Sequence, residues 1–150
     1  MNAVMHMRAQ TELATIYEIS KILTSSLDVS KTCREALNVL ANNMGYRRCM
    51  IIVDTEEGEL HLLAAVGLSP EEYDAGHYRP GEGIIGKVVE SGEAISIPDI
   101  HSEKSFLNRM KIKRRKDIPI SFTAVPFRVD GQVAGVIAIE KEFESAEVLK

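Results

Sequence analysis

The 150-residue chain is 45% hydrophobic and 27% charged, which suits one compact domain that folds without a disulfide or a metal. Its two cysteines, Cys33 and Cys49, are too few for a secreted disulfide framework and fit no metal-binding motif, so we expect a cytoplasmic protein. No apolar run is long enough to span a membrane. The net charge of −4 and the aromatic content of 5% argue against direct nucleic-acid binding.

Two amphipathic helices are predicted at the start of the chain. In residues 9–27 apolar side chains recur in alternating steps of four and three, which is typical of a helix with a coiled-coil-like seam. We expect this helix to pack on the core and to form a homodimer rather than a long free coiled coil. The residues expected at the dimer interface are Leu13, Ile16, Ser20, Leu23 and Leu27. A second helix is expected from the N-cap residue Asp28 to Gly45.

The rest of the chain is predicted to form two hairpins and a connecting region. Residues 49–53 and 59–66 are short apolar runs around a turn, and residues 119–129 and 132–140 flank Asp130-Gly131, the strongest hairpin signal in the sequence. The connecting region is expected to hold three short elements. These are a capped helix at 69–72, a helix at 83–91 and a strand at 93–97.

This order of elements predicts a single α+β domain. The helical pair of residues 1–45 is expected on one face of an antiparallel sheet formed within residues 46–140. Crossover loops and helices from the same region would cover the other face, and residues 141–150 would form a tail.

A glycine motif and a basic segment lie in the connecting region. Gly81, Gly83 and Gly86 spell G-x-G-x-x-G, but no βαβ unit surrounds them, so a structural turn is favoured over a phosphate-binding loop. Residues 102–116 are expected to form a helix or a mobile loop, and 104–116 contain seven of the 18 lysines and arginines. That basic segment could bind an anion, bind an acidic partner, or be a solvated loop.

Few other residues indicate chemistry. The histidines are scattered and no carboxylate pair stands out, so neither a metal site nor a catalytic centre is predicted. Asp99 is a functional candidate, although capping of a turn is favoured. Ser121 and Thr123 alternate along one strand, where their hydroxyls could orient a ligand or simply bond to backbone.

The stretches PGEGIIGKVVESGEAISIPDI (residues 80–100) and SFTAVPFRVDGQVAGVIAIE (residues 121–140), together with the order of elements, resemble a GAF domain. With the N-terminal helices included, the chain is similar to the N-terminal regulatory domain of NifA-type sigma-54-dependent transcriptional activators. The signatures of the cyclic-nucleotide, bilin-binding and methionine-sulfoxide-reducing members are not found. The family's final helix has no counterpart before the sequence ends, which indicates a fragment.

The resemblance implies a regulatory function. Such a domain senses a small molecule or a nitrogen-signalling protein and controls an attached AAA+ ATPase that precedes a DNA-binding domain. A ligand-free dimerisation module is the alternative, and a small redox enzyme is a distant third. No cofactor is expected beyond a small anionic ligand such as 2-oxoglutarate. The residues expected to bind it are Ile97, Asp99, Phe106, Arg109, Lys111, Ser121 and Thr123.

Overall fold

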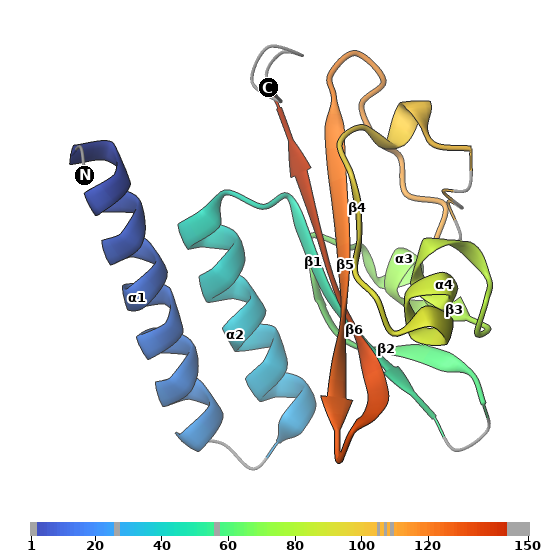
Figure 1. The fold of residues 1–150 in the computed structure, drawn as a ribbon, viewed down its shortest axis with the longest axis horizontal. Helices are drawn as coiled ribbons and strands as arrows, with labels where there is room; N and C mark the ends of the chain where they lie inside the picture. Colours follow the sequence, from blue (N-terminus) through green and yellow to red (C-terminus); the bar gives the residue numbers. More distant parts are fainter. Residues whose placement is uncertain are drawn as a thin grey trace.

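A six-stranded antiparallel sheet separates two layers of helices in the computed structural model (Figure 1). The structure describes residues 3–143 except 26–27, 56–57, 105, 107 and 109. The helices are α1 (Ala3–Ser25), α2 (Val29–Met44), α3 (Pro70–Asp74), α4 (Gly83–Ser91) and the 3-10 helix η1 (Ile100–Ser102). The strands are β1 (Arg48–Asp54), β2 (Leu60–Val66), β3 (His77–Tyr78), β4 (Ile95–Ile97), β5 (Ile120–Val129) and β6 (Gln132–Glu142). The strand order is β3-β2-β1-β6-β5-β4. The predicted α+β class is confirmed.

The predicted caps of α2 are both present. The Asp28 carboxylate accepts a hydrogen bond from the backbone N–H of Lys31 at 3.0 Å, and Gly45 ends the helix with a φ of 72°. That left-handed conformation is one that glycine adopts without steric cost. The buried side of α2 rests on β1 and β2, where Leu37 and Ala41 contact Cys49 and other side chains of the sheet.

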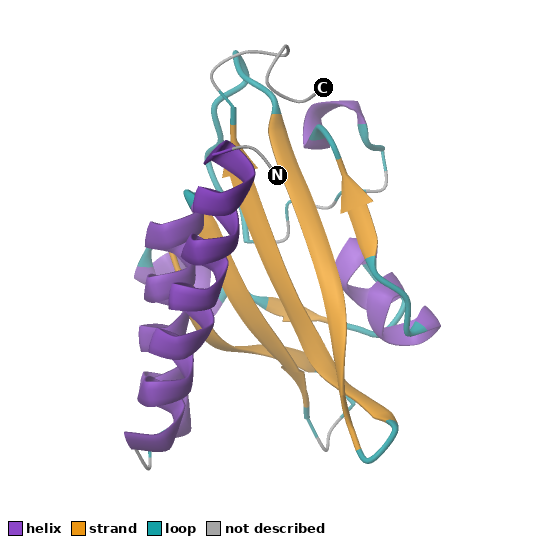
Figure 2. Ribbon diagram, turned by 60° about the vertical axis from the view of Figure 1, so that its left-hand side comes forward, coloured by secondary structure: helices purple, strands orange, loops and turns teal. Residues whose placement is uncertain are grey.

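The first helix lies outside the second rather than on the sheet. In Figure 1, α2 lies between α1 and the sheet, and Figure 2 shows the two helices side by side on the same side of the sheet. Asn43 of α2 donates a hydrogen bond to the buried hydroxyl of Thr15 at 2.8 Å. Leu13 and Ile16 are 69% and 62% exposed. The expected packing of this helix on the core of the sheet is therefore wrong, because α2 lies between α1 and the sheet (Figure 1).

The hairpins form as predicted, with differences in the connecting region. Asp130 and Gly131 have φ values of 53° and 79°, as a tight two-residue turn between β5 and β6 requires. Ser69 begins α3 with a reciprocal capping box to Glu72. The two-residue strand β3 was not predicted, and the described residues of 103–116 form no regular helix.

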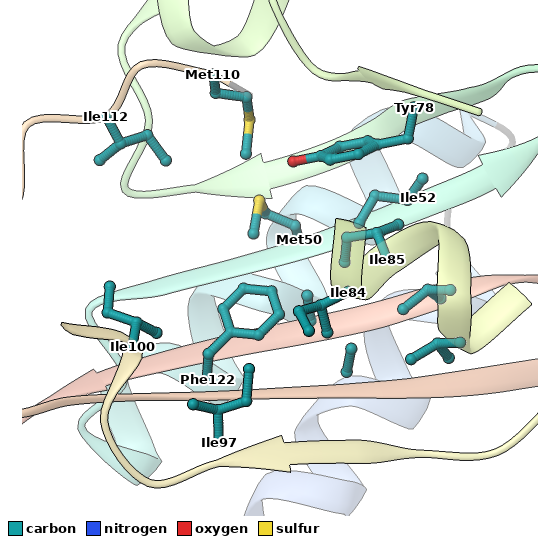
Figure 3. Packing of buried hydrophobic residues seen from close by; sticks show 14 of the residues in the cluster. Met50, Ile52, Tyr78, Ile84, Ile85, Ile97, Ile100, Met110, Ile112 and Phe122 are labelled. Atoms are coloured by element: carbon teal, nitrogen blue, oxygen red, sulfur yellow. The ribbon is translucent and has the colours of Figure 1, made fainter. Parts of the chain in front are cut away.

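Two separate cores lie on the two faces of the sheet. We call the face toward α3, α4 and residues 100–118 the crossover face, and the face toward α2 the helix face. Side chains alternate between them along every strand. On the crossover face, Met50, Tyr78 and Phe122 pack with isoleucines of α4 and of the crossover (Figure 3). The helix face holds a smaller buried cluster under α2.

Candidate functional site

Two adjoining cavities lie on the crossover face of the sheet and share the residues Phe106, Asn108 and Arg114. The inner cavity has a volume of about 10 Å³, which is room for roughly one water molecule. The outer cavity has a volume of about 200 Å³. Besides the shared residues, the inner cavity is lined by Met50, Tyr78, Gly83, Ile84, Ile85, Met110 and Phe122. Ile100, His101, Ile112 and Lys116 complete the outer one.

The wall between the cavities combines aromatic rings with a guanidinium. The rings of Phe106 and Phe122 meet edge to face with centroids 5.0 Å apart. The guanidinium carbon of Arg114 lies 5.1 Å from the centroid of Phe106, within the range of a cation–π contact. An apolar surface beside one fixed cation is suited to a small organic anion.

Asn108 holds the loop that carries Arg114. Its carboxamide nitrogen donates to the carbonyl of Ile112 at 2.9 Å, and its carboxamide oxygen accepts from the N–H of Ile112 at 2.9 Å. The same oxygen accepts from Nη1 of Arg114 at 3.0 Å. The loop therefore fixes the direction of the guanidinium without a regular helix.

A buried ionic triad lies beside the cavities. Glu140 is fully buried; its Oε1 accepts from Nε of Arg114 at 2.8 Å and lies 2.8 Å from Nη2 of the same guanidinium. Its Oε2 accepts from Nη1 of Arg48 at 2.6 Å. Both arginine side chains are 7% exposed. Such a triad is costly to bury and costly to break, because each remaining charge would lose its partner.

The glycine motif forms a structural turn. The N–H of Gly81 donates to the carbonyl of Gly86 at 2.9 Å. A Cβ on Gly86 would lie only 2.5 Å from the carbonyl oxygen of Arg79 and closer than 3 Å to the backbone of Gly81. The close approach of two backbone segments explains this glycine, and the turn delivers Gly83 and the start of α4 to the inner cavity.

The structure brings only part of the predicted ligand site together. Phe106 lines both cavities, as described above. Ile97 is buried in the core of the crossover face. Asp99 caps a turn, since its carboxylate accepts from the N–H of His101 at 3.1 Å and of Ile120 at 3.4 Å. Arg109 lies outside the described residues.

Three predicted residues lie elsewhere. Lys111 is exposed and borders a different hollow, beside α3. The prediction that Ser121 and Thr123 face the crossover is wrong, because they alternate with Ile120, Phe122 and the other buried residues of β5. They point to the helix face, where the hydroxyl of Thr123 bonds to that of Ser96 at 3.0 Å.

Sequence reasoning missed Arg114, Asn108, Tyr78 and Glu140. Arg114 was one of several cations in the basic segment, with nothing local to distinguish it. Glu140 did carry a signal. It follows Val136 and Ala138 at the inward positions of an apolar strand, and a lone carboxylate at such a position needs a cationic partner.

The two cysteines lie on the helix face, away from the cavities. Burial raises the pKa of the Cys49 thiol to about 12 and also raises the pKa of Cys33. A raised pKa keeps a thiol protonated and weakens it as a nucleophile. Neither cysteine lines the two cavities.

The part of the chain that the structure describes holds neither a metal-binding cluster nor a membrane-spanning helix. No three histidine, cysteine or carboxylate side chains gather there in a group suited to a metal ion. None of the described helices combines the length and apolar character that crossing a membrane requires.

The fold and the sequence define the class of protein. Residues 28–148 match the family model of the GAF domain, and the chain belongs to this family. It is 44% identical over 135 residues to a Nif-specific regulatory protein of Herbaspirillum seropedicae, covering 89% of this chain and 25% of that protein. It is 40% identical to the nitrogen fixation protein VnfA of Azotobacter vinelandii, covering 92% and 27%. The chain thus spans about a quarter of the length of these relatives, and it is homologous to a domain of nitrogen-fixation regulators.

Solved structures give the same class. The GAF domain of A. aeolicus nlh2 in an inactive state superposes with a TM-score of 0.78 at 30% identity, covering 94% of this chain and 85% of that one. A free methionine-R-sulfoxide reductase from Neisseria meningitidis has a TM-score of 0.68 at 19% identity, covering 85% and 71%. At that identity the likeness concerns the fold alone.

Proposed function

We propose that this GAF domain is the regulatory sensor domain of a NifA-like, sigma-54-dependent transcriptional activator. It binds a small anionic metabolite, with 2-oxoglutarate as the first candidate, and controls an attached AAA+ ATPase. It acts as a sensor in the cytoplasm rather than as an enzyme. The similarity to nitrogen-fixation regulators supports the regulatory assignment.

One observation carries the ligand assignment. The guanidinium of Arg114 lines both cavities and lies against the ring of Phe106. A planar guanidinium matches a carboxylate in two parallel hydrogen bonds, while the aromatic wall contacts the carbon chain of the ligand. Lys116 at the outer cavity supplies a second cation, which favours a dicarboxylate.

Calorimetry and thermal unfolding with 2-oxoglutarate test this function. A ligand at a hundredfold excess over its dissociation constant stabilises the native state by about 2.7 kcal/mol. In a domain of this size that raises Tm by several degrees. The Arg114→Gln variant should lose the shift, and Lys111→Gln, outside the cavities, should keep it. No heat and no shift at millimolar 2-oxoglutarate would contradict the proposal.

A second candidate function is a ligand-free dimerisation module, and the small inner cavity favours it. The exposed side of α1 carries Leu13, Ile16 and Tyr17, all more than 60% exposed. Exposed apolar side chains grouped in this way are commonly buried against a partner. Ser20 lies on the same exposed side, whereas Leu23 and Leu27 lie outside the residues whose side chains the structure describes.

Light scattering at high micromolar concentration tests the dimer. The native chain should have the mass of a dimer, and the double variant Leu13→Asp, Ile16→Asp should have that of a monomer. Ala14→Asp is the matched control, because it places one of the same charges at an exposed position about 100° around the helix from Leu13. A monomeric native chain would contradict the dimer.

A further inference from the structure

We infer that Glu140 is an internal competitor for Arg114: a ligand carboxylate replaces Glu140 on the guanidinium, so Glu140 sets the affinity of the site and restricts it to acidic ligands. This inference rests on the proposed function and assigns the determinant of specificity within the same site. It follows from how the triad divides its hydrogen bonds, from its charge, and from its access to the cavities.

The two arginines use different oxygens of Glu140. Oε1 accepts from Nε of Arg114 and forms an ion pair with its Nη2, whereas Oε2 accepts from Nη1 of Arg48. Release of Arg114 therefore leaves Glu140 paired with Arg48. An incoming carboxylate can take the place of Oε1 beside Nε and Nη2 of Arg114, so each buried charge keeps a partner during the exchange.

The charge of the triad favours an anion. Two guanidiniums that are always protonated face one carboxylate, which leaves one positive charge in a site that water barely reaches. Nε of Arg48 is buried and has no hydrogen-bond partner among the described residues, so the guanidiniums are not fully satisfied. A monoanionic group at Arg114 balances the charge, whereas a neutral ligand would leave it unbalanced.

Only one triad member reaches the ligand space. Arg114 lines both cavities, while Arg48 and Glu140 line neither. A ligand therefore meets the triad at Arg114, where Asn108 and Phe106 already fix the guanidinium. The competition takes place at this single residue.

The test measures 2-oxoglutarate affinity by calorimetry in the double variant Arg48→Met, Glu140→Gln. This variant keeps the net charge of the site and removes the competing carboxylate. The hydrogen bond between Arg114 and Glu140 joins two charged groups and is therefore strong. Removal of the competing carboxylate should tighten the binding of 2-oxoglutarate about tenfold. Glu142→Gln is the matched control, because Glu142 lies two residues further along the same strand and pairs with Arg47 at 3.2 Å. The Glu142→Gln variant should bind 2-oxoglutarate with the affinity of the native chain.

An uncharged ligand and a second variant complete the test. The uncharged dimethyl ester of 2-oxoglutarate should not bind the native chain. If the double variant fails to fold, Glu140→Asp, which keeps the charge but withdraws the carboxylate by one methylene, should also tighten binding. Unchanged or weaker binding in the folded variants overturns the inference and leaves the proposed function standing. Binding of the diester as tight as that of the acid overturns the inference together with the anionic ligand of the proposed function. No binding by the native chain and by the variants overturns both.

Discussion

The two faces of the sheet differ in how completely they are covered. The crossover face holds the larger core, the buried triad and both cavities. The helix face has a smaller core under α2, and beyond α2 it leaves Val125 and Ile137 exposed at 45% and 36%. One sheet thus presents two chemically different surfaces. The closed face has the polar groups of the proposed ligand site, and the open face has exposed apolar surface.

Removal of the carboxylate buried on the crossover face should have the greatest cost in stability. Glu140→Ala leaves two buried guanidiniums without their carboxylate and should destabilise the fold by about 3 to 5 kcal/mol. Glu142→Ala removes a carboxylate from the same strand whose partner Arg47 is 54% exposed, and it should cost at most about 1 kcal/mol. Urea unfolding of both variants measures the difference, and equal costs would contradict the burial of the triad on the crossover face.

A smaller effect concerns the thiol buried on the helix face. Because burial raises the pKa of Cys49 from 9.0 to about 12, the folded chain keeps the proton that the unfolded chain loses above pH 9. The free energy of unfolding should therefore fall as the pH rises from 9 to 12. Between pH 8 and pH 10 the loss from this thiol is about 1.4 kcal/mol.

Urea unfolding at the two pH values, on the native chain and on Cys49→Ala, isolates this contribution. Other groups that titrate in this range affect both proteins alike, so the difference between the two declines belongs to Cys49. An identical decline in the variant would show that the helix-face core admits water at this position.

The smallest effect comes from removing one methylene on each face. Ile52→Val, in the core of the crossover face, should cost about 1 kcal/mol because Ile52 is fully buried. Ile137→Val, on the open part of the helix face, should stay within about 0.5 kcal/mol of the native chain. Thermal and urea unfolding compare the pair. A similar cost at Ile137 would mean that another element covers this face in solution.

Local signals in the sequence predicted most of the elements. Asp28 and Gly45 cap the two ends of α2, and Asp130-Gly131 forms the turn of the last hairpin. These features were predictable because caps and tight turns depend on only a few neighbouring residues. The order of the elements predicted the α+β class, and the resemblance to GAF domains, which the family match confirms, implied the same arrangement.

The site was harder to predict because it depends on contacts between distant residues. Arg48 and Glu140 are 92 positions apart, and Arg114 and Glu140 are 26 apart, so no local pattern links them. The hydroxyls of Ser121 and Thr123 were assigned to the wrong face, since alternation shows that two residues share a face but not which face it is. The position of α1 outside α2 likewise depends on tertiary packing.

Pro126 has a consequence for solubility. β4 pairs with β5 only from Phe122 to Ala124, so the rest of β5 runs along an edge of the described sheet. An apolar strand at a free edge can pair with the same strand of another molecule and begin aggregation. Proline has no N–H to offer such a partner, and the bulge that follows Phe127 makes the strand irregular. These two features protect the chain against edge-to-edge aggregation without using any group that lines the two cavities.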